Sequence, residues 1–160
     1  MRLMIAAVGR MKAGPEREMV ARYLDRATGS GKPLALTGFD VIELTESRAS
    51  SSSSRKADEA KRLHAALPDG IVVALDERGK SIGSENFAGQ IGRWRDDGRP
   101  AVSFVIGGAD GLDPAFVSQA DLVLSFSPLT WPHQLVRIML AEQLYRTTTI
   151  LSGHPYHRGD

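Results

Sequence analysis

The 160-residue sequence contains no cysteine, and this absence excludes several kinds of site. A disulfide framework, a thiolate zinc centre, an iron–sulfur cluster and a cysteine nucleophile all need that side chain. The sequence also has no large excess of one charge: 20 basic and 19 acidic residues leave a net charge of +1. Because nucleic-acid-binding domains are often strongly basic, the bulk charge by itself points to no such partner.

Long hydrophobic runs are missing as well. No apolar stretch approaches the ~20 residues of a membrane-spanning helix. The apolar start, Leu3–Val8, is short and is followed by Arg10 and Lys12, so we expect no signal peptide. With 42% hydrophobic and 24% charged residues, the composition is that of an ordinary globular protein. These features predict a cytoplasmic protein with one domain over residues 1–160 and no membrane partner.

Short apolar runs alternate with segments of helical periodicity along the chain. Strands are expected at Leu3–Val8, 39–44, Ile71–Leu75, Ala101–Ile106 and Leu122–Leu124, the last as a third central strand. Helices are expected from Pro15, over Arg55–Leu67, from a cap at Ser84 to about Asp96, after Pro114, and from Thr130–Pro132 to about Thr147. This alternation predicts an α/β fold, with a mostly parallel sheet covered by helices on both faces.

Residues 45–54 are expected to form a loop, because they include five consecutive serines, Ser50–Ser54. Such a stretch supplies no apolar stripe for a core. Two interpretations stay open here. The loop is either a flexible part of the surface or a mobile lid over a substrate.

Ligands of parallel sheets bind beyond the carboxyl ends of the strands, and three segments lie there. Leu75-Asp76 ends one strand, Gly107–Gly111 follows another, and Ser125–Trp131 is an irregular stretch before a helix. Glycines let a ligand approach the backbone and leave amides free to donate, although a tight turn needs them equally. The spacing excludes a Rossmann fingerprint. It also excludes a phosphate loop at Gly79–Ser81, because Ala74 stands where that motif needs its first glycine.

Three of the four histidines, His133, His154 and His157, lie in the last 28 residues. We expect no metal site, because acidic partners are sparse around them. A histidine here can instead act as an acid, a base or a positioning donor. In the same tail, Tyr156 can stack on a base and Arg158 can hold a phosphate. The alternative is a tail that is pinned to its own domain or to a dimer mate.

Five ordered motifs carry a resemblance to a known family. They are Leu75-Asp76-x-x-Gly79-Lys80, Ile106-Gly107-Gly108-x-x-Gly111-Leu112, Ser127-x-Leu129-Thr130-x-Pro132-His133, Ala141–Arg146 and His154–Arg158. In this order they resemble the small SPOUT-class methyltransferases of the H type, which methylate N3 of a pseudouridine in large-subunit ribosomal RNA. The resemblance covers essentially the whole chain. One departure is the run Ser50–Ser54, which stands where the family usually has a more basic loop.

The resemblance implies a C-terminal trefoil knot, S-adenosylmethionine as the cofactor, and an obligate homodimer whose active site spans both subunits. The cofactor-binding residues that it implies are Leu75, Gly107, Gly108, Phe126, Ser127, Pro128, Leu129, Thr130 and Trp131. The catalytic candidates are His154, His157 and Arg158, with one of the histidines as the base that accepts the N3 proton. The residues expected to position the nucleotide or organise its site are Tyr156, Arg158, Arg137 and Glu142.

The expected function is therefore methylation of large-subunit ribosomal RNA. We expect the substrate to be the assembled ribosome, because a nearly neutral chain makes few phosphate contacts by itself. The first alternative is a non-catalytic dimer that binds RNA or the ribosome and has no affinity for the cofactor. The second is a small-molecule enzyme on a flavodoxin-like sheet, which would not associate with RNA.

Overall fold

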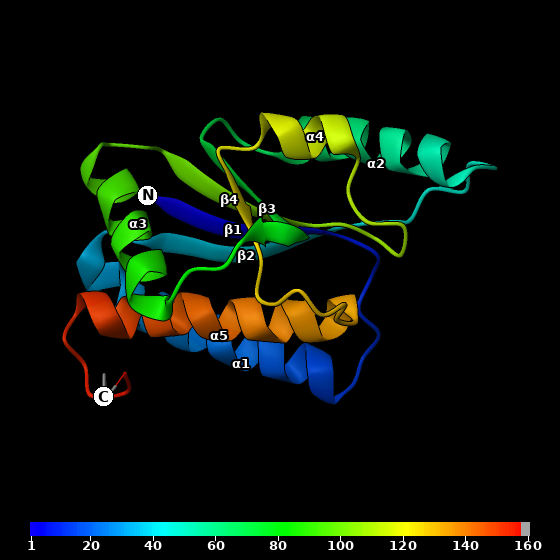
Figure 1. Ribbon diagram of the computed structural model, residues 1–160. Coiled ribbons are helices and arrows are strands. Elements are labelled where there is room, and N and C mark those ends of the chain that lie inside the picture. Colours follow the sequence, from blue (N-terminus) through cyan, green and yellow to red (C-terminus); the bar gives the residue numbers. More distant parts are fainter. Residues whose placement is uncertain (158–160) are drawn as a thin grey trace.

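A computed structural model describes residues 1–157 and shows a parallel five-stranded sheet between two layers of helices (Figure 1). The strands are β1 (Arg2–Val8), β2 (Thr37–Leu44), β3 (Ile71–Lys80), β4 (Ala101–Ile106) and β5 (Leu122–Leu124). The helices are α1 (Pro15–Gly31), α2 (Ser52–Ala66), α3 (Ser84–Asp96), α4 (Pro114–Gln119) and α5 (His133–Leu151), with a 3₁₀ turn at Lys32–Leu34. The predicted α/β class is confirmed.

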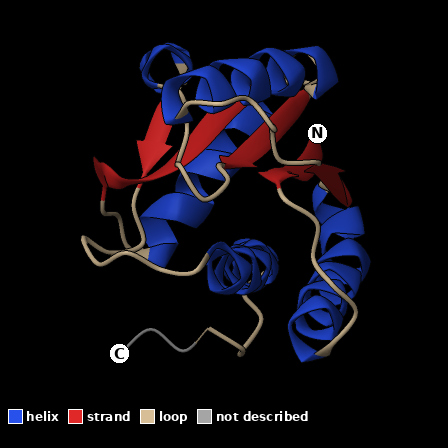
Figure 2. Ribbon diagram, turned by 90° about the vertical axis from the view of Figure 1, so that its right-hand side faces the viewer, coloured by secondary structure: helices blue, strands red, loops and turns tan. Residues whose placement is uncertain are grey.

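The strand order in the sheet is β2-β1-β4-β3-β5, and every neighbouring pair is parallel. Helices α1, α3 and α5 cover one face, and α2 and α4 cover the other (Figures 1 and 2). Leu75 pairs with Ile106 on one side and with Leu124 on the other. This register brings the ends of β3, β4 and β5 to one level, where the three predicted ligand segments begin.

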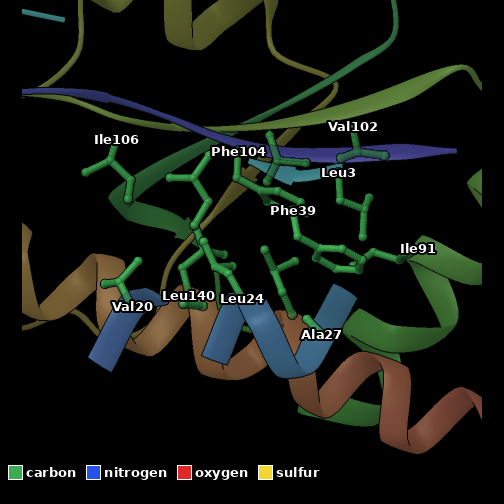
Figure 3. Close-up of a cluster of buried hydrophobic side chains, with 14 of the residues drawn as sticks. Leu3, Val20, Leu24, Ala27, Phe39, Ile91, Val102, Phe104, Ile106 and Leu140 are labelled. Carbon is green, nitrogen blue, oxygen red and sulfur yellow. The ribbon is translucent and has the colours of Figure 1, made fainter. Parts of the chain in front are cut away.

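Strand β1 is buried almost along its whole length because helices cover both faces of the sheet. Leu3, Ile5 and Ala7 join the larger apolar cluster with α1, α3 and α5 (Figure 3), whereas Ala6 and Val8 join a smaller cluster with α2 and α4. Each fully buried leucine or isoleucine contributes about 1.5–3 kcal/mol. The continuous apolar run therefore marks a strand with two buried faces. Among residues 1–157, no helix combines the length and apolarity needed to span a membrane.

The prediction of a loop over residues 45–54 is wrong for its last three residues, because α2 begins at Ser52 and not at Arg55. Ser51 caps this helix: its hydroxyl oxygen accepts a 3.1 Å hydrogen bond from the Ser54 N–H. Serine is unfavourable inside a helix but among the best residues at its N-cap. The serine run is thus the capped first turn of α2.

Strand β5 lies at the edge of the sheet, so its expected central position is wrong. Sequence order does not set sheet order, and β5 pairs only with β3. Strand β3 also continues beyond the expected end at Leu75. The register shifts after that residue, and Lys80 then pairs with Leu124. The segment between Leu75 and Lys80 therefore leaves and rejoins the sheet.

Two helix ends differ from the expected ones. Gly83, not Ser84, is the N-cap of α3, and the Ser84 hydroxyl instead donates to Gln143 of α5 at 2.9 Å. Helix α5 continues past Thr147 to Leu151. In its last turns, the hydroxyls of the buried Thr148 and Thr149 donate back to carbonyls of the preceding turn, which satisfies polar groups that would otherwise argue against a helix.

Candidate functional site

A cleft of about 760 Å³ opens beyond the carboxyl ends of β3, β4 and β5. Leu75, Gly107 and Gly108 line it, as the position of these strand ends requires. It is also lined by the predicted loop residues Phe126, Ser127, Leu129, Thr130 and Trp131. Pro128 is exposed and is not part of the lining. All but one of the predicted cofactor residues thus share a single cavity.

The glycine loop after β4 is folded back closely on itself. A Cβ on Gly107 would lie 2.7 Å from the carbonyl carbon of Gly111 and 2.8 Å from the nitrogen of Leu112, which is closer than real side chains approach backbone. The Gly111 N–H donates to the Gly108 carbonyl at 3.0 Å, and Gly111 has a φ of +80°. Glycine is needed at 107 for space and at 111 for conformation.

The loop after β5 is held by the hydroxyl groups of its own residues. The Ser125 oxygen accepts from the Ser127 N–H at 3.2 Å, and the Ser127 oxygen accepts from the Leu129 N–H at 3.0 Å. The Thr130 hydroxyl donates to Glu77 at 3.0 Å, which ties the loop to the irregular part of β3. Leu129 is 66% exposed at the rim. The loop is therefore shaped by bonds that leave its apolar side chains facing the cleft mouth.

The C-terminal tail folds back and packs along α5 as far as Glu142, in the middle of the helix. The Tyr156 hydroxyl donates to Glu142 at 3.1 Å, and Arg146 donates to the same carboxylate oxygen at 3.0 and 2.6 Å. The Arg146 guanidinium also lies 5.0 Å from the centre of the Tyr156 ring. Burial, and then the neighbouring Glu142 carboxylate, raises the pKa of Tyr156 to about 12. The phenol thus stays a hydrogen-bond donor at neutral pH.

The two tail histidines have different surroundings. His154 is exposed, and its Nδ1 accepts from the Tyr156 N–H at 3.1 Å. His157 is half-buried, with Nδ1 3.2 Å from Arg146 and Nε2 3.5 Å from Glu85. The third catalytic candidate of the tail, Arg158, lies outside the residues that the structure describes.

Arg137 is only 1% exposed, although its expected role is to position the nucleotide. Its guanidinium donates to Glu43 at 2.8 Å and to the carbonyls of Val8 and Gly9 at 3.0 and 2.6 Å. Burial lowers the pKa of Arg137, and the Glu43 carboxylate opposes this effect. The side chain thus fastens α5 to the ends of β1 and β2.

Up to His157, where the described part of the chain ends, no residue of the tail lines the cleft. The cleft loop leads into the N-terminal end of α5, and the tail leaves its C-terminal end (Figure 1). The helix has 19 residues. The tail folds back along this helix as far as Glu142, whereas Val136 lines the cleft, so at 1.5 Å per residue the two points are roughly 9 Å apart along the helix.

Two polar contacts around the cleft escape sequence analysis. Glu77 holds Thr130, and Arg55 of α2 pairs with Asp110 of the glycine loop. Asp110 and Asp113 are equally good candidates to cap the helix that follows the glycines, but the structure gives that role to Asp113. No local pattern marks a pair that joins residues 55 positions apart.

Proteins similar to this chain are known at the levels of family, sequence and structure. A family model described as "Predicted SPOUT methyltransferase" matches residues 1–157. The chain belongs to the SPOUT methyltransferase family. It is 60% identical over 159 residues to the "Ribosomal RNA large subunit methyltransferase H" of Allorhizobium ampelinum, and 58% identical over 159 residues to the protein of that name in Brucella anthropi. Each alignment covers 99% of both chains.

Two solved structures share the fold of this SPOUT family member. A "Probable Methyltransferase from Bordetella pertussis Tohama I" superposes with a TM-score of 0.52 at 14% identity, covering 91% of this chain and 95% of that one. TrmJ from Z. mobilis ZM4 gives a TM-score of 0.51 at 15% identity, covering 98% and 71%. The family expected from five sequence motifs is confirmed. In residues 1–157, no group of three potential metal ligands comes together.

Proposed function

We propose that this chain transfers the methyl group of S-adenosylmethionine to N3 of a pseudouridine in large-subunit ribosomal RNA. The observation that carries the proposal is the joint location of Leu75, Gly107 and the 126–131 loop in one cleft, in a chain that resembles the H-type enzymes over its full length. We further propose that residues 1–160 act as one domain with the C-terminal trefoil knot of the family, and that the protein acts in the cytoplasm on ribosomes.

The cleft has the size and lining that such a cofactor needs. Its volume falls within the roughly 300–1,000 Å³ of small-molecule sites. Close packing at Gly107 keeps the backbone bare, so that amides and carbonyls there can bind adenosine. Leu75, Ile106 and Val136 add apolar wall, and Asp76 and Glu77 place negative charge beside a cationic ligand.

The cofactor supplies a sulfonium-bound methyl that is already electrophilic. Transfer of this methyl to N3 would leave the bond electrons on sulfur as a neutral thioether, and a base of this protein would accept the N3 proton. We assign that base to His154 or His157, with Tyr156 and Arg158 positioning the nucleotide. The contribution of the cleft is in-line placement of the two reactants.

A homodimer in which each site takes its tail from the other subunit is supported by the cleft lining, which includes none of the described tail residues of the same chain. In a two-fold pair, the same surface of each copy meets the other, so antiparallel α5 helices would bring one tail to the partner cleft. Helices α1 and α5 leave apolar groups for such contact: Met19 is 39% and Leu135 41% exposed. Beside them, Ile138 and Met139 help to line a second cavity of about 390 Å³.

Labelled S-adenosylmethionine tests this function directly. The purified protein is mixed with free ribosomal RNA, with separate subunits and with assembled ribosomes, and the digested RNA is analysed for methylated nucleosides. We expect 3-methylpseudouridine in large-subunit RNA, with the highest yield from assembled ribosomes. A chain that binds ribosomes but has no calorimetric affinity for the cofactor would instead be the non-catalytic alternative.

A further inference from the structure

The capped first turn of α2 sends one side chain toward the cofactor cleft. The Ser51 hydroxyl donates to the Ser54 hydroxyl at 2.8 Å, in addition to accepting from the Ser54 N–H. These bonds fix the start of the helix, and Arg55 follows directly. The serine run therefore has a defined structural consequence, because it sets the point from which Arg55 extends.

Arg55 grips Asp110 with two parallel hydrogen bonds. Its Nε lies 2.6 Å from one carboxylate oxygen and its Nη2 lies 3.0 Å from the other. Its Nη1 donates to the Ala49 carbonyl at 3.2 Å, so all three guanidinium nitrogens are engaged. The side chains are 31% and 26% exposed, and the pairing holds the pKa of Asp110 below its usual value. A bidentate pair of this kind fixes orientation as well as distance.

Asp110 lies inside the glycine loop, between the two glycines whose backbones close the turn. Gly108 and Gly111 form that turn, and both line the cleft with Asp110 itself. A loop with three glycines loses more backbone freedom on ordering than other sequences do. The contact with Arg55 restrains this loop from outside, at its tip.

We propose that Arg55 is a positioning residue that raises affinity for the cofactor by holding the glycine loop through Asp110. The inference rests on the proposed function and assigns a role to a residue that does not line the cleft. A loop that is ordered before binding lowers the entropy cost of binding. Loss of Arg55 should therefore weaken cofactor binding, and should leave turnover nearly unchanged once the cofactor saturates the site and itself orders the loop.

Three variants test this role by calorimetry with S-adenosylmethionine and by methylation kinetics. Arg55→Met keeps the aliphatic stem, and we expect the Kd and the KM for the cofactor to rise about five-fold with little change in kcat. Arg55→Lys should fall between it and the wild type, because a single ammonium cannot form the fork. Arg62→Met is the matched control: it breaks the ion pair with Asp58 on the same helix, away from the cleft, and should leave the Kd unchanged.

A double variant separates this role from general stabilisation. If the pair acts as a unit, Arg55→Met combined with Asp110→Asn should bind the cofactor no more weakly than the weaker single variant. A lower Tm for Arg55→Met with a wild-type Kd would overturn the proposal, because Arg55 would then only stabilise the fold. That outcome leaves the proposed function intact, whereas a wild-type protein without any cofactor affinity would overturn the proposed function as well.

Discussion

The regions at the two ends of α5 differ in the parts of the chain that form them. At the N-terminal end, the cleft is shaped by strand ends, glycines and loop hydroxyls. At the C-terminal end, the tail is a network of charged and aromatic side chains around Glu142. Strand topology builds the first region within one chain. Up to His157, the second region contributes no side chain to the cleft, and in the proposed dimer it would complete the cleft of the other copy.

The largest expected effect is the loss of cofactor binding after a substitution in the cleft, at the N-terminal end of α5. Gly107→Val should abolish cofactor binding, because even a Cβ there meets the backbone of Gly111 at 2.7 Å. Gly29→Ala is the control, since a Cβ in that helix has open space around it. It should leave binding intact and stabilise the protein by about 0.5–1 kcal/mol. Calorimetry measures the cofactor affinity of the two variants, and thermal unfolding measures their stability. An unchanged affinity in Gly107→Val would show that this residue is not part of the cofactor site.

Removal of the tail should affect methylation but not cofactor binding. Deletion of 154–160 should leave the Kd for S-adenosylmethionine unchanged and reduce methylation to background. The cleft keeps all its lining residues, whereas both candidate bases are lost. Normal turnover after deletion would show that the base lies elsewhere.

Mixing the two defective proteins tests whether the regions meet across a dimer. Gly107→Val and the 154–160 deletion should each be inactive. Exchange of subunits between them should restore about a quarter of the wild-type activity, because half of the dimers are mixed and each has one intact site. No recovery, with exchange verified by mass spectrometry, would place cleft and tail of the same chain in one site.

Arg137 lies near the cleft end but is buried, and its replacement should act on stability. Arg137→Met leaves Glu43 without its partner, and should lower the free energy of unfolding by about 3 kcal/mol. Arg2→Met breaks the exposed pair with Asp40, and should cost less than about 1 kcal/mol. Urea denaturation measures both. A stable Arg137→Met that no longer binds RNA would instead support the substrate role predicted from the sequence.

The smallest effect concerns the tyrosine of the tail. The pKa of Tyr156 is raised in the folded state, so its contact is fully present below pH 10 and is lost as the pH rises through about 12. An ultraviolet titration should show one of the three tyrosines ionising near pH 12, and Tyr156→Phe should remove that step. Ionisation of Tyr156 near its ordinary value of 10 would mean that the tail is not packed against Glu142.

Local patterns predict the cleft better than the tail. The apolar part of β3 up to Leu75, the strand that ends at Ile106 and the glycines after it follow from apolar runs and spacing, and parallel topology then places them together. The position of β5 at the sheet edge could not be predicted, because nothing local fixes sheet order. The pair of Arg55 with Asp110 and the burial of Arg137 are equally beyond local pattern, since both depend on contacts distant in sequence.

The bonds of Arg137 also have a consequence for folding during synthesis. They join the end of the first strand to the last helix, over 129 positions between Arg137 and Val8. Strand β1 lies between β2 and β4, so it too waits for distant partners. Contacts of such long range slow folding. Most of this chain must therefore be translated before β1 has all its partners in the sheet. Until then the apolar strand stays accessible to chaperones.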